Sequence, residues 1–375
     1  MRVDAVRLHL LHIPFKGAFE HALKRRTEAE TVIVVLRTAA GTVGVGEIAP
    51  RSYLTGETID RVLDEAAPAQ ARRCLGETLA TRDQVVTWLR TGLERAGRDL
   101  ATFGGFELAM LDAAGQELGF TFADVLGGAA GPELPAGIVL GFEVATRALK
   151  KQCALARLAG RRHVKVKVGR ADDLERLEII SHTLGKDLPL RLDANGAWSV
   201  PEAIERLKVF GAVVNVASIE QPVAGDDLAG LRRVRLETGV KVMADESLCS
   251  VEDGRRLIAA EAVDIFNVRI GKCGGVLGSL RLVELARSAG LGLHLGALVG
   301  ETAVLSRAAE IFGRHVPELD CLEGKGQNRF LLEGDIASEV EGRAGLGLEL
   351  QEDALRRYER RREEQGASIL PAATA

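Results

Sequence analysis

The chain has 375 residues, of which 46% are hydrophobic and 27% are charged, and its formal net charge is -4. This length suits a large barrel together with a second domain, and the composition allows a sizeable buried core. No long block of like charge favours nucleic-acid binding, and no apolar run reaches the roughly 20 residues needed to span a bilayer.

The cysteines and the N-terminus indicate where the protein works. The five cysteines are Cys74, Cys153, Cys249, Cys273 and Cys321. Their odd number, scattered positions and lack of CxxC spacing predict reduced thiols rather than disulfides or a zinc site. The start, MRVDAVRLHLLHIPFK, is interrupted by charge, His and Pro, so no secretory signal is expected. We therefore expect a cytoplasmic protein.

The first 50 residues predict β-structure. VDAVRLHLLHI alternates, TVIVVLRTAAG is a β-branched run, and GTVGVGEIAP follows a glycine turn. The polar segment GAFEHALKRRTEAE between the first two runs is too irregular to predict an element. Helices are expected near 58–73, with Thr58 as the cap, and near 83–95 and 104–119. This part is α+β and lacks a regular strand–helix period.

From about residue 135 the pattern becomes strand, helix, strand, helix, and it continues to the short run ELDCLEG. About eight strands are expected, which predicts a (β/α) barrel, with a doubly wound open sheet as the alternative. Ser199 and Glu202 predict a capping box, and Ser250 and Asp253 a weaker one. Near the C-terminus, QEDALRRYERRREEQ predicts an amphipathic helix, and the final GASILPAATA is expected to be disordered.

Five charged residues recur within the barrel pattern at intervals of 25 to 27 residues. They are Lys167, Asp193, Glu220, Asp245 and Lys272, and each closes a strand-like run or directly follows one. A strand, a crossover helix and two short loops take about this length. The spacing therefore predicts that consecutive parallel strands bring these groups to one end of the barrel.

Three neighbouring carboxylates would repel one another unless a cation lay between them. Asp193, Glu220 and Asp245 offer only oxygen ligands, which favours Mg²⁺ or Mn²⁺ over zinc or copper. Each carboxylate taken alone is better explained as a helix cap or a loop residue. The metal prediction therefore depends on their shared position at the ends of consecutive strands.

The lysines predict acid–base chemistry. In VKVKV, Lys165 and Lys167 share one face of the strand, and an inward lysine near other cations would have a lowered pKa. The alternative is a solvated edge strand. Lys272 is expected across the barrel from Lys167, so that two bases could act on opposite faces of one carbon. Gly274 and Gly275, which follow it, are expected to bind an anionic group with their backbone N–H donors.

Taken together, these motifs resemble the muconate lactonizing enzyme subgroup of the enolase superfamily. The matching pieces are PFK, GVGEIAPRSYLTGET, KVKVG, LDANGAW, IEQPV, MADES and NVRIGKCGG, spread over nearly the whole chain. The resemblance implies an N-terminal α+β capping domain over residues 1–125 and a modified (β/α)7β barrel over residues 126–322. It also implies a C-terminal segment, residues 323–375, that returns to the cap.

The resemblance also implies roles for individual residues. Asp193, Glu220 and Asp245 would bind Mg²⁺, with Asn195 and Glu246 orienting them. Lys167 and Lys272 would be the acid–base pair, supported by Lys165. Cap segments Phe15–Arg26 and Arg51–Thr55 would shape the substrate pocket. The pocket candidates are Phe19, Tyr53 and the barrel-lining His294. A homo-oligomer is implied as well.

Superfamily membership determines the removal of a proton α to a carboxylate, with an enediolate stabilised by the metal, but not the product. We expect a racemase or epimerase of an N-acyl amino acid, a dipeptide or a similar acid. The start PFKGAFEHA with YLTGET looks most like dipeptide epimerases, but their paired Asp-x-Asp is replaced here by the run Asp320-Cys321-Leu322-Glu323. The alternatives are a muconate-type cycloisomerase, an o-succinylbenzoate-type dehydratase, and a non-catalytic binding protein on the same fold.

Overall fold

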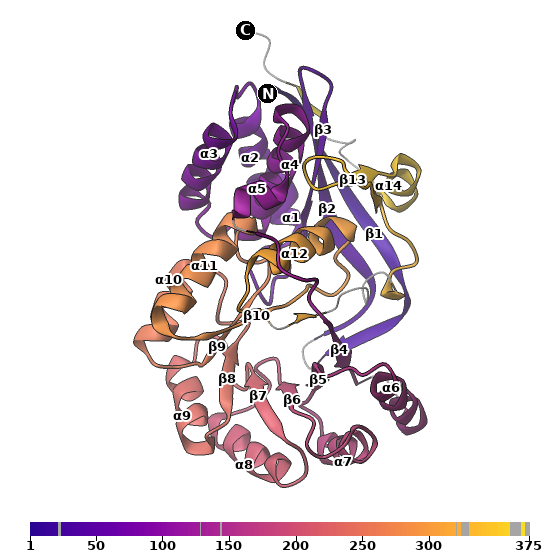
Figure 1. The fold of residues 1–375 in the computed structure, drawn as a ribbon, viewed down its shortest axis with the longest axis vertical. Coiled ribbons are helices and arrows are strands. Elements are labelled where there is room, and N and C mark those ends of the chain that lie inside the picture. The colour runs from indigo at the N-terminus through magenta and orange to yellow at the C-terminus, as the bar shows by residue number, and fades with distance from the viewer. Residues whose placement is uncertain are drawn as a thin grey trace.

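The computed structural model describes residues 1–21, 24–127, 129–142, 145–319, 321–323, 330–360 and 369–371. An N-terminal α+β part packs over one end of a closed barrel, and segments near the C-terminus lie beside the N-terminal sheet (Figure 1). Among the described residues, no helix is both long and apolar enough to cross a bilayer.

The barrel is closed by strands that pair in parallel, in the order β10-β11-β4-β5-β6-β7-β8-β9. Its strands are β4 (Ala136–Leu140), β5 (Val164–Lys167), β6 (Leu190–Asp193), β7 (Val216–Glu220), β8 (Lys241–Ala244), β9 (Ile265–Val268), β10 (Gly292–Leu295) and β11 (Leu322–Glu323). The helices between them are α6 (Thr146–Leu158), α7 (Asp173–Leu184), α8 (Val200–Gly211), α9 (Leu228–Thr238), α10 (Val251–Ala259), α11 (Gly275–Ala289) and α12 (Ala303–His315). The predicted barrel is confirmed, and the doubly wound open sheet is excluded.

The helix caps form at the predicted residues, but the capping box predicted to be the weaker one is the complete one. Ser250 and Asp253, which looked like the weaker pair, form the complete reciprocal capping box at the start of α10. Ser199 caps α8 by accepting the hydrogen bond of the Glu202 N–H. The Glu202 side chain does not close a box at α8 and instead accepts from Arg206 Nε at 2.8 Å.

The N-terminal sheet has the order β14-β1-β2-β3. Its long strands are β1 (Val3–His21), β2 (Lys24–Thr38) and β3 (Val43–Ile48). The polar segment for which no element was predicted belongs to the β1–β2 hairpin, with a register shift between Pro14 and Phe19. Backbone groups form the ladder, so the strands continue where the side chains no longer alternate.

The helices of the N-terminal part are α1 (Ile59–Arg61), a π-helical turn (Val62–Ala66), α2 (Ala67–Cys74), α3 (Arg82–Arg95), α4 (Leu100–Leu118) and α5 (Phe122–Leu126). Thr58 caps α1 as expected. Helix α4 is buried from Leu100 to Gly115, because β3 covers one side of it while α3 and the barrel helix α11 cover others. A helix that is apolar around most of its circumference suits such a position.

The C-terminal segment returns to this sheet. It contains β12 (Ala337–Glu339), β13 (Leu348–Leu350), α14 (Glu352–Tyr358) and β14 (Ile369–Pro371). The predicted amphipathic helix is confirmed only as far as Tyr358. The expectation of a disordered tail is wrong for Ile369–Pro371, which pair with Ala5–Arg7 of β1 and so satisfy backbone groups of an edge strand.

Glycines let the sheet and helix α4 come unusually close. A Cβ on Gly46 of β3 would lie 1.8 Å from the carbonyl oxygen of Gly105 in α4, and one on Gly44 would lie 2.2 Å from that of Ala109. These obstacles are backbone atoms, which cannot rotate out of the way. The approach therefore requires glycine at both positions.

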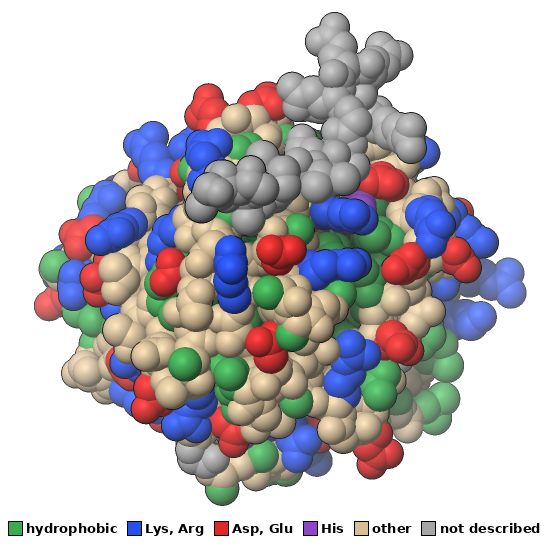
Figure 2. Space-filling view, turned by 90° about the horizontal axis from the view of Figure 1, so that it is seen from above, with side chains coloured by type: hydrophobic (Ala, Val, Ile, Leu, Met, Phe, Trp, Pro, Cys, Tyr) green, Lys and Arg blue, Asp and Glu red, His purple; other side chains and the backbone are tan. Residues whose placement is uncertain are grey.

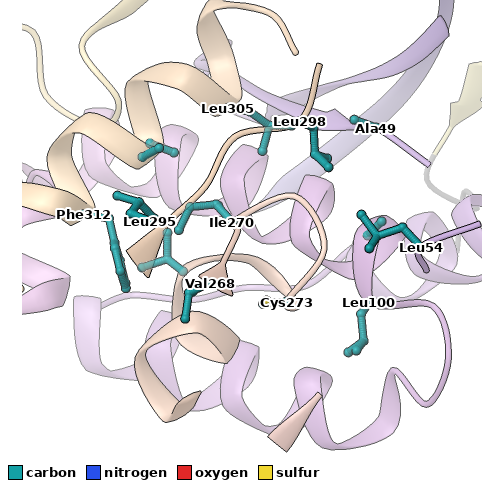
Figure 3. Close-up of a cluster of buried hydrophobic side chains, with 14 of the residues drawn as sticks. Ala49, Leu54, Leu100, Val268, Ile270, Cys273, Leu295, Leu298, Leu305 and Phe312 are labelled. Atoms are coloured by element: carbon teal, nitrogen blue, oxygen red, sulfur yellow. The ribbon is translucent and has the colours of Figure 1, made fainter. Parts of the chain in front are cut away.

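Buried carboxylates join the N-terminal part to the barrel. Glu47 of β3 accepts hydrogen bonds from the backbone N–H and the hydroxyl of Thr302, the cap residue of α12, at 3.0 and 2.7 Å. Nearby, Glu301 accepts from Leu298 N–H at 2.9 Å and from the Ser306 hydroxyl at 3.1 Å. Burial first, with Glu47 adding to it, raises the pKa of Glu301 to about 8. A buried apolar cluster lies along the same boundary (Figure 3).

Glu301 should make stability depend on pH between its ordinary pKa of 4.5 and its raised pKa of about 8. Its carboxyl binds a proton more tightly in the folded state, so its stabilising contribution is complete below pH 4.5 and is lost as pH rises through about 8. We expect the free energy of unfolding to fall between about pH 4.5 and 8, and Glu301→Gln to reduce that fall. Urea unfolding of both proteins across this range measures the difference, and parallel curves would refute it.

Gly46→Ala should destabilise the fold by about 1–3 kcal/mol, because the new methyl group overlaps the Gly105 carbonyl. Gly211→Ala at the end of α8 is the control, since a Cβ there meets nothing within 4 Å. Urea unfolding of the two variants should show a lower midpoint for the first alone. Equal midpoints would contradict the close approach.

Candidate active site

The parallel register brings the predicted charged groups together at the C-terminal end of the barrel. Lys167 pairs with Asp193 across β5 and β6, and Asp193 pairs with Glu220 across β6 and β7. Asp245 directly follows β8, and Lys272 lies in the turn after β9. All five side chains are buried. The five charged residues, which are evenly spaced in the sequence, thus form a compact cluster in the structure.

Lys165 lies among carboxylates from three other strands. Its Nζ is 2.7 Å from Asp193 Oδ2, 2.9 Å from Glu220 Oε1 and 3.2 Å from Glu323 Oε1. Burial acts to lower the pKa of Lys165, but the three carboxylates outweigh it and the pKa is raised. The expectation of a lowered pKa is therefore wrong for Lys165. Its direct neighbours are mainly anions, which favour the ammonium form.

Lys167 and Lys272 each pair with one of the carboxylates. Lys167 Nζ donates to Asp193 Oδ2 and to Asn195 Oδ1, both at 2.7 Å. Lys272 Nζ donates to the backbone oxygen of Asp245 at 2.6 Å and to its Oδ1 at 2.8 Å. Burial acts to lower the pKa of Lys272, but Asp245 outweighs it and the pKa is raised. Both lysines are thereby held by the carboxylate cluster.

Asn195 connects several groups of the cluster. It has a positive φ of 46°, its N–H donates to Asp193 Oδ1 at 3.0 Å, and its Nδ2 donates to Glu246 Oε1 at 3.0 Å. Asparagine is one of the few non-glycine residues that adopt this backbone region readily. Burial, with Asp245 and Asp193 adding to it, raises the pKa of Glu246 to about 7. Asn195 thus orients Lys167 and Asp193 together.

The chain's own cations neutralise the three carboxylates. Arg269 Nη2 lies 3.3 Å from Glu220 Oε1 and also donates to Asp245 Oδ2, while Asn267 Nδ2 donates to Glu220 Oε1 at 3.0 Å. Within the described ranges, no three acidic, His or Cys side chains are grouped closely enough to hold a metal as they stand. The donor set nevertheless fits one. Glu220 Oε2 is buried and makes no hydrogen bond, with Arg191 Nε 3.4 Å away, and the ligands are all oxygens, as hard divalent cations prefer.

Comparison with known proteins identifies the family. Residues 148–354, more than half of the chain, match the family model described as Enolase C-terminal domain-like. The chain belongs to the enolase superfamily. Its relatives include racemases, epimerases and muconate lactonizing enzymes, so this superfamily member falls in the mandelate racemase and muconate lactonizing enzyme group.

Individual relatives cover most of the chain. An N-succinyl-L-Arg/Lys racemase of Bacillus cereus is 26% identical, over 95% of this chain and 97% of its own length. A hydrophobic dipeptide epimerase of Enterococcus faecalis is 28% identical, over 82% of this chain and 86% of its own length. The muconate lactonizing enzyme structure from Pseudomonas fluorescens, in complex with muconolactone, has a TM-score of 0.84 at 26% identity, covering 96% of this chain and 99% of its own.

In this superfamily member, Glu323 on the last barrel strand is a charged residue whose place the sequence did not predict. Besides Lys165, its carboxylate contacts Arg191 and lies 3.3 Å from His294 Nε2. Burial acts to raise the pKa of Glu323, but Arg191 and Lys165 outweigh it and the pKa is lowered well below its usual range. Asp320, which precedes it in the unusual run, lies outside the described residues.

Two residues of the site, Arg191 and Arg269, were not predicted, although the alternation of side chains along a strand could have indicated them. Arg191 shares parity with Asp193 in β6, and Arg269 continues the parity of Asn267 from β9, so both would be expected to face inward. Glu323 gives no comparable signal, because β11 spans only Leu322 and Glu323. Its two cationic partners, Lys165 and Arg191, lie 158 and 132 residues away along the chain.

His294 lies away from the C-terminal mouth of the barrel. It lines a cavity of about 380 Å³ at the N-terminal ends of the strands, together with Lys165, Arg191 and Cys321. Burial, and then Arg191, lowers its pKa. The expectation that His294 lines the barrel is confirmed. His294 Nε2 also lies 3.3 Å from Glu323 Oε2, and its role in a substrate pocket stays a prediction.

A separate cleft of about 690 Å³ opens between the N-terminal part and the barrel mouth. It is lined by Tyr53 and Arg61 from the first and by Asn195, Glu246 and Arg256 from the second, among others. Tyr53 therefore borders the same space as two residues of the charged cluster. Phe19 belongs to β1, but its side chain lies outside the described part.

Glu323→Gln should destabilise the protein by about 1–3 kcal/mol, because Arg191 and Lys165 each lose a charged hydrogen-bond acceptor, although Glu220 still pairs with both. Glu318→Gln provides the control, since the Glu318–Arg287 pair lies on the surface and should contribute only about 0–1 kcal/mol. Urea unfolding measures both. A similar small loss in the two variants would show that Glu323 does not neutralise the cluster.

Proposed function

We propose that this superfamily member is a metal-dependent isomerase that removes the proton α to a substrate carboxylate. The reaction we propose is racemisation or epimerisation of an N-acyl amino acid, a dipeptide or a similar acid. One observation carries the proposal: β5 and β9 are four steps apart around the closed strand order, so Lys167 and Lys272 approach the carboxylates from opposite sides.

Two opposed lysines suit inversion at one carbon. In one direction a neutral lysine accepts the α-proton from one face, and the opposite ammonium group returns a proton to the other face. The reverse direction exchanges the two roles. Asn195 keeps Lys167 at the proper position, since its side-chain oxygen accepts from Nζ at 2.7 Å. Lys165, with its raised pKa, remains a cation that offsets the negative charge around it.

We assign Mg²⁺, with Mn²⁺ as the alternative, to Asp193, Glu220 and Asp245. The metal would supply positive charge to stabilise the negative charge that develops as the α-proton leaves. The structure of the Enterococcus faecalis dipeptide epimerase, with a TM-score of 0.83 at 26% identity, is a complex with Mg and the dipeptide L-Leu-L-Tyr. This relative supports both the metal and a small-molecule substrate.

The last barrel strand favours a substrate whose amino group is acylated. The resemblance to dipeptide epimerases implies paired aspartates there to hold a free amino end. Among the described residues of this strand the carboxylate is Glu323, and Lys165, Arg191 and His294 already engage its two oxygens. The N-succinyl-L-Arg/Lys racemase aligns by sequence with 95% of this chain and the hydrophobic dipeptide epimerase with 82%, while the structure of that epimerase covers 93%.

Cycloisomerisation is the second candidate. A chloromuconate cycloisomerase of Cupriavidus necator is 26% identical over 96% of this chain and all of its own length. In that reaction one lysine would transfer the proton and the other would act mainly as a cation. The two candidates differ in whether the α-proton of the substrate exchanges with solvent and inverts.

The test is incubation with Mg²⁺ in D₂O against N-succinyl and other N-acyl amino acids, dipeptides and muconates, followed by NMR. We expect α-proton exchange with inversion, and its loss after metal removal with EDTA. Lys167→Ala should abolish exchange of one enantiomer and Lys272→Ala exchange of the other, because each lysine serves one face.

Asp172→Asn is the control, since Asp172 caps α7 outside the cluster and should leave exchange unchanged. Conversion of muconate without exchange at an inverting carbon would support the cycloisomerase. Absence of exchange and of turnover with every substrate would contradict proton abstraction from these acids.

A further inference from the structure

A carboxylate of the cap occupies the start of the helix that follows Lys272. Glu107 of α4 accepts hydrogen bonds from the backbone N–H groups of Val276 at 2.5 Å and Leu277 at 2.9 Å. These are the first turn of α11. The sequence predicted that Gly274 and Gly275 would bind an anionic group with their own N–H donors. Gly275 N–H instead donates to the Ile270 oxygen, and the carboxylate of Glu107 binds at the next two residues.

The turn that carries Lys272 has little freedom. Lys272 N–H and Cys273 N–H both donate to the Arg269 oxygen at 3.0 Å, and Gly275 N–H donates to the Ile270 oxygen at 3.2 Å. Gly274 and Gly275 follow with positive φ values of 76° and 73°. Such a backbone transmits a displacement of the helix start at Gly275 directly to Lys272, three positions earlier.

Helix α4 packs closely against this turn. A Cβ on Gly275 would lie 1.9 Å from Glu107 Oε2, and one on Gly104 would lie 2.8 Å from the Gly275 nitrogen. Figure 3 shows Ile270 and Cys273 of the turn in the same buried cluster as Leu54 and Leu100 of the cap. The Lys272 turn is therefore packed against the cap rather than against the barrel alone.

Among the described residues, Glu107 forms no ion pair with a lysine, arginine or histidine. Burial raises its pKa to about 8, and the opposing influences are the two N–H groups of α11. The two N–H groups lie at a helix N-terminus, where they favour negative charge and so partly offset the effect of burial on the pKa of Glu107.

We propose that Glu107 is a positioning residue for Lys272, through which the cap aligns one of the two acid–base lysines of the barrel. The inference rests on the proposed function, because alignment is defined by proton transfer at Lys272. Lys167 lies on β5, far from this contact in the strand order, so loss of Glu107 affects the two faces of the substrate unequally.

The test compares Glu107→Gln with Asp112→Asn. Glutamine keeps the size of Glu107 but has one acceptor oxygen for two N–H groups. Asp112 lies five positions further along α4, is equally buried, and accepts from Val45 N–H at 3.0 Å and Leu346 N–H at 2.9 Å. Both of its partners lie outside the barrel strands and helices, so Asp112→Asn controls for the loss of a buried helix carboxylate.

The first measurement is α-proton exchange of each enantiomer in D₂O. The enantiomer that Lys272→Ala fails to exchange identifies the face served by Lys272. Glu107→Gln should slow exchange of that enantiomer about 10- to 100-fold relative to the other, as expected for a base displaced by up to 1 Å. Asp112→Asn should leave the ratio of the two rates unchanged. Equal slowing of both enantiomers by Glu107→Gln would overturn the proposal.

The second measurement is amide hydrogen exchange over residues 273–280, which needs no substrate. Glu107→Gln should reduce protection of Val276 and Leu277, and Asp112→Asn should not. If Glu107→Gln does not fold, Gly104→Ala tests the same contact from the backbone side, with the same selective loss expected. If the unaltered protein exchanged neither enantiomer, the proposed function would fail, and unchanged protection in Glu107→Gln would separately refute the anchor.

Discussion

Charge balance inside the barrel mouth is the constraint on which the site depends. Asp193, Glu220, Asp245 and Glu323 are buried together with Lys165, Lys167, Arg269 and Lys272, and the partly exposed Arg191 joins them. A buried ion is costly unless it is paired and hydrogen-bonded. Each carboxylate here has at least one cation within 4 Å, and Lys165 alone contacts three of them. The network keeps acidic groups close to a position where a divalent cation would use them.

The cap contributes to this site through helix termini. Glu47 meets the start of α12, Glu107 meets the start of α11, and Glu57 accepts from the N–H groups of Ala101 and Thr102 at the start of α4. The first N–H groups of a helix have no partner within the helix, so each carboxylate satisfies donors that would otherwise be buried unpaired. The same contacts set the position of α4 over the barrel. The charged faces away from this boundary carry mixed signs, as Figure 2 shows for the described part of one face.

The spacing of strands and helices made the central cluster predictable. Lys167, Asp193 and Glu220 are neighbours because each closes a parallel strand of nearly the same repeat length, and that period is visible in the sequence. Arg191 and Arg269 could have been predicted from strand parity. The position of His294 could not have been predicted in this way. The alternation along a strand indicates that a side chain faces the barrel interior, but not how deep in the barrel it lies.

The sequence by itself determined the fold class, the end of the barrel that carries the chemistry, and the types of residue gathered there. These follow from local periods of strand and helix, which a single chain displays without its partners. Only the tertiary structure decided that Glu323 closes the charge network and that Glu107 occupies the helix start beside Lys272. Glu107 and Val276 are 169 residues apart along the chain. No local pattern encodes such a contact, because it exists only once the cap has packed on the barrel.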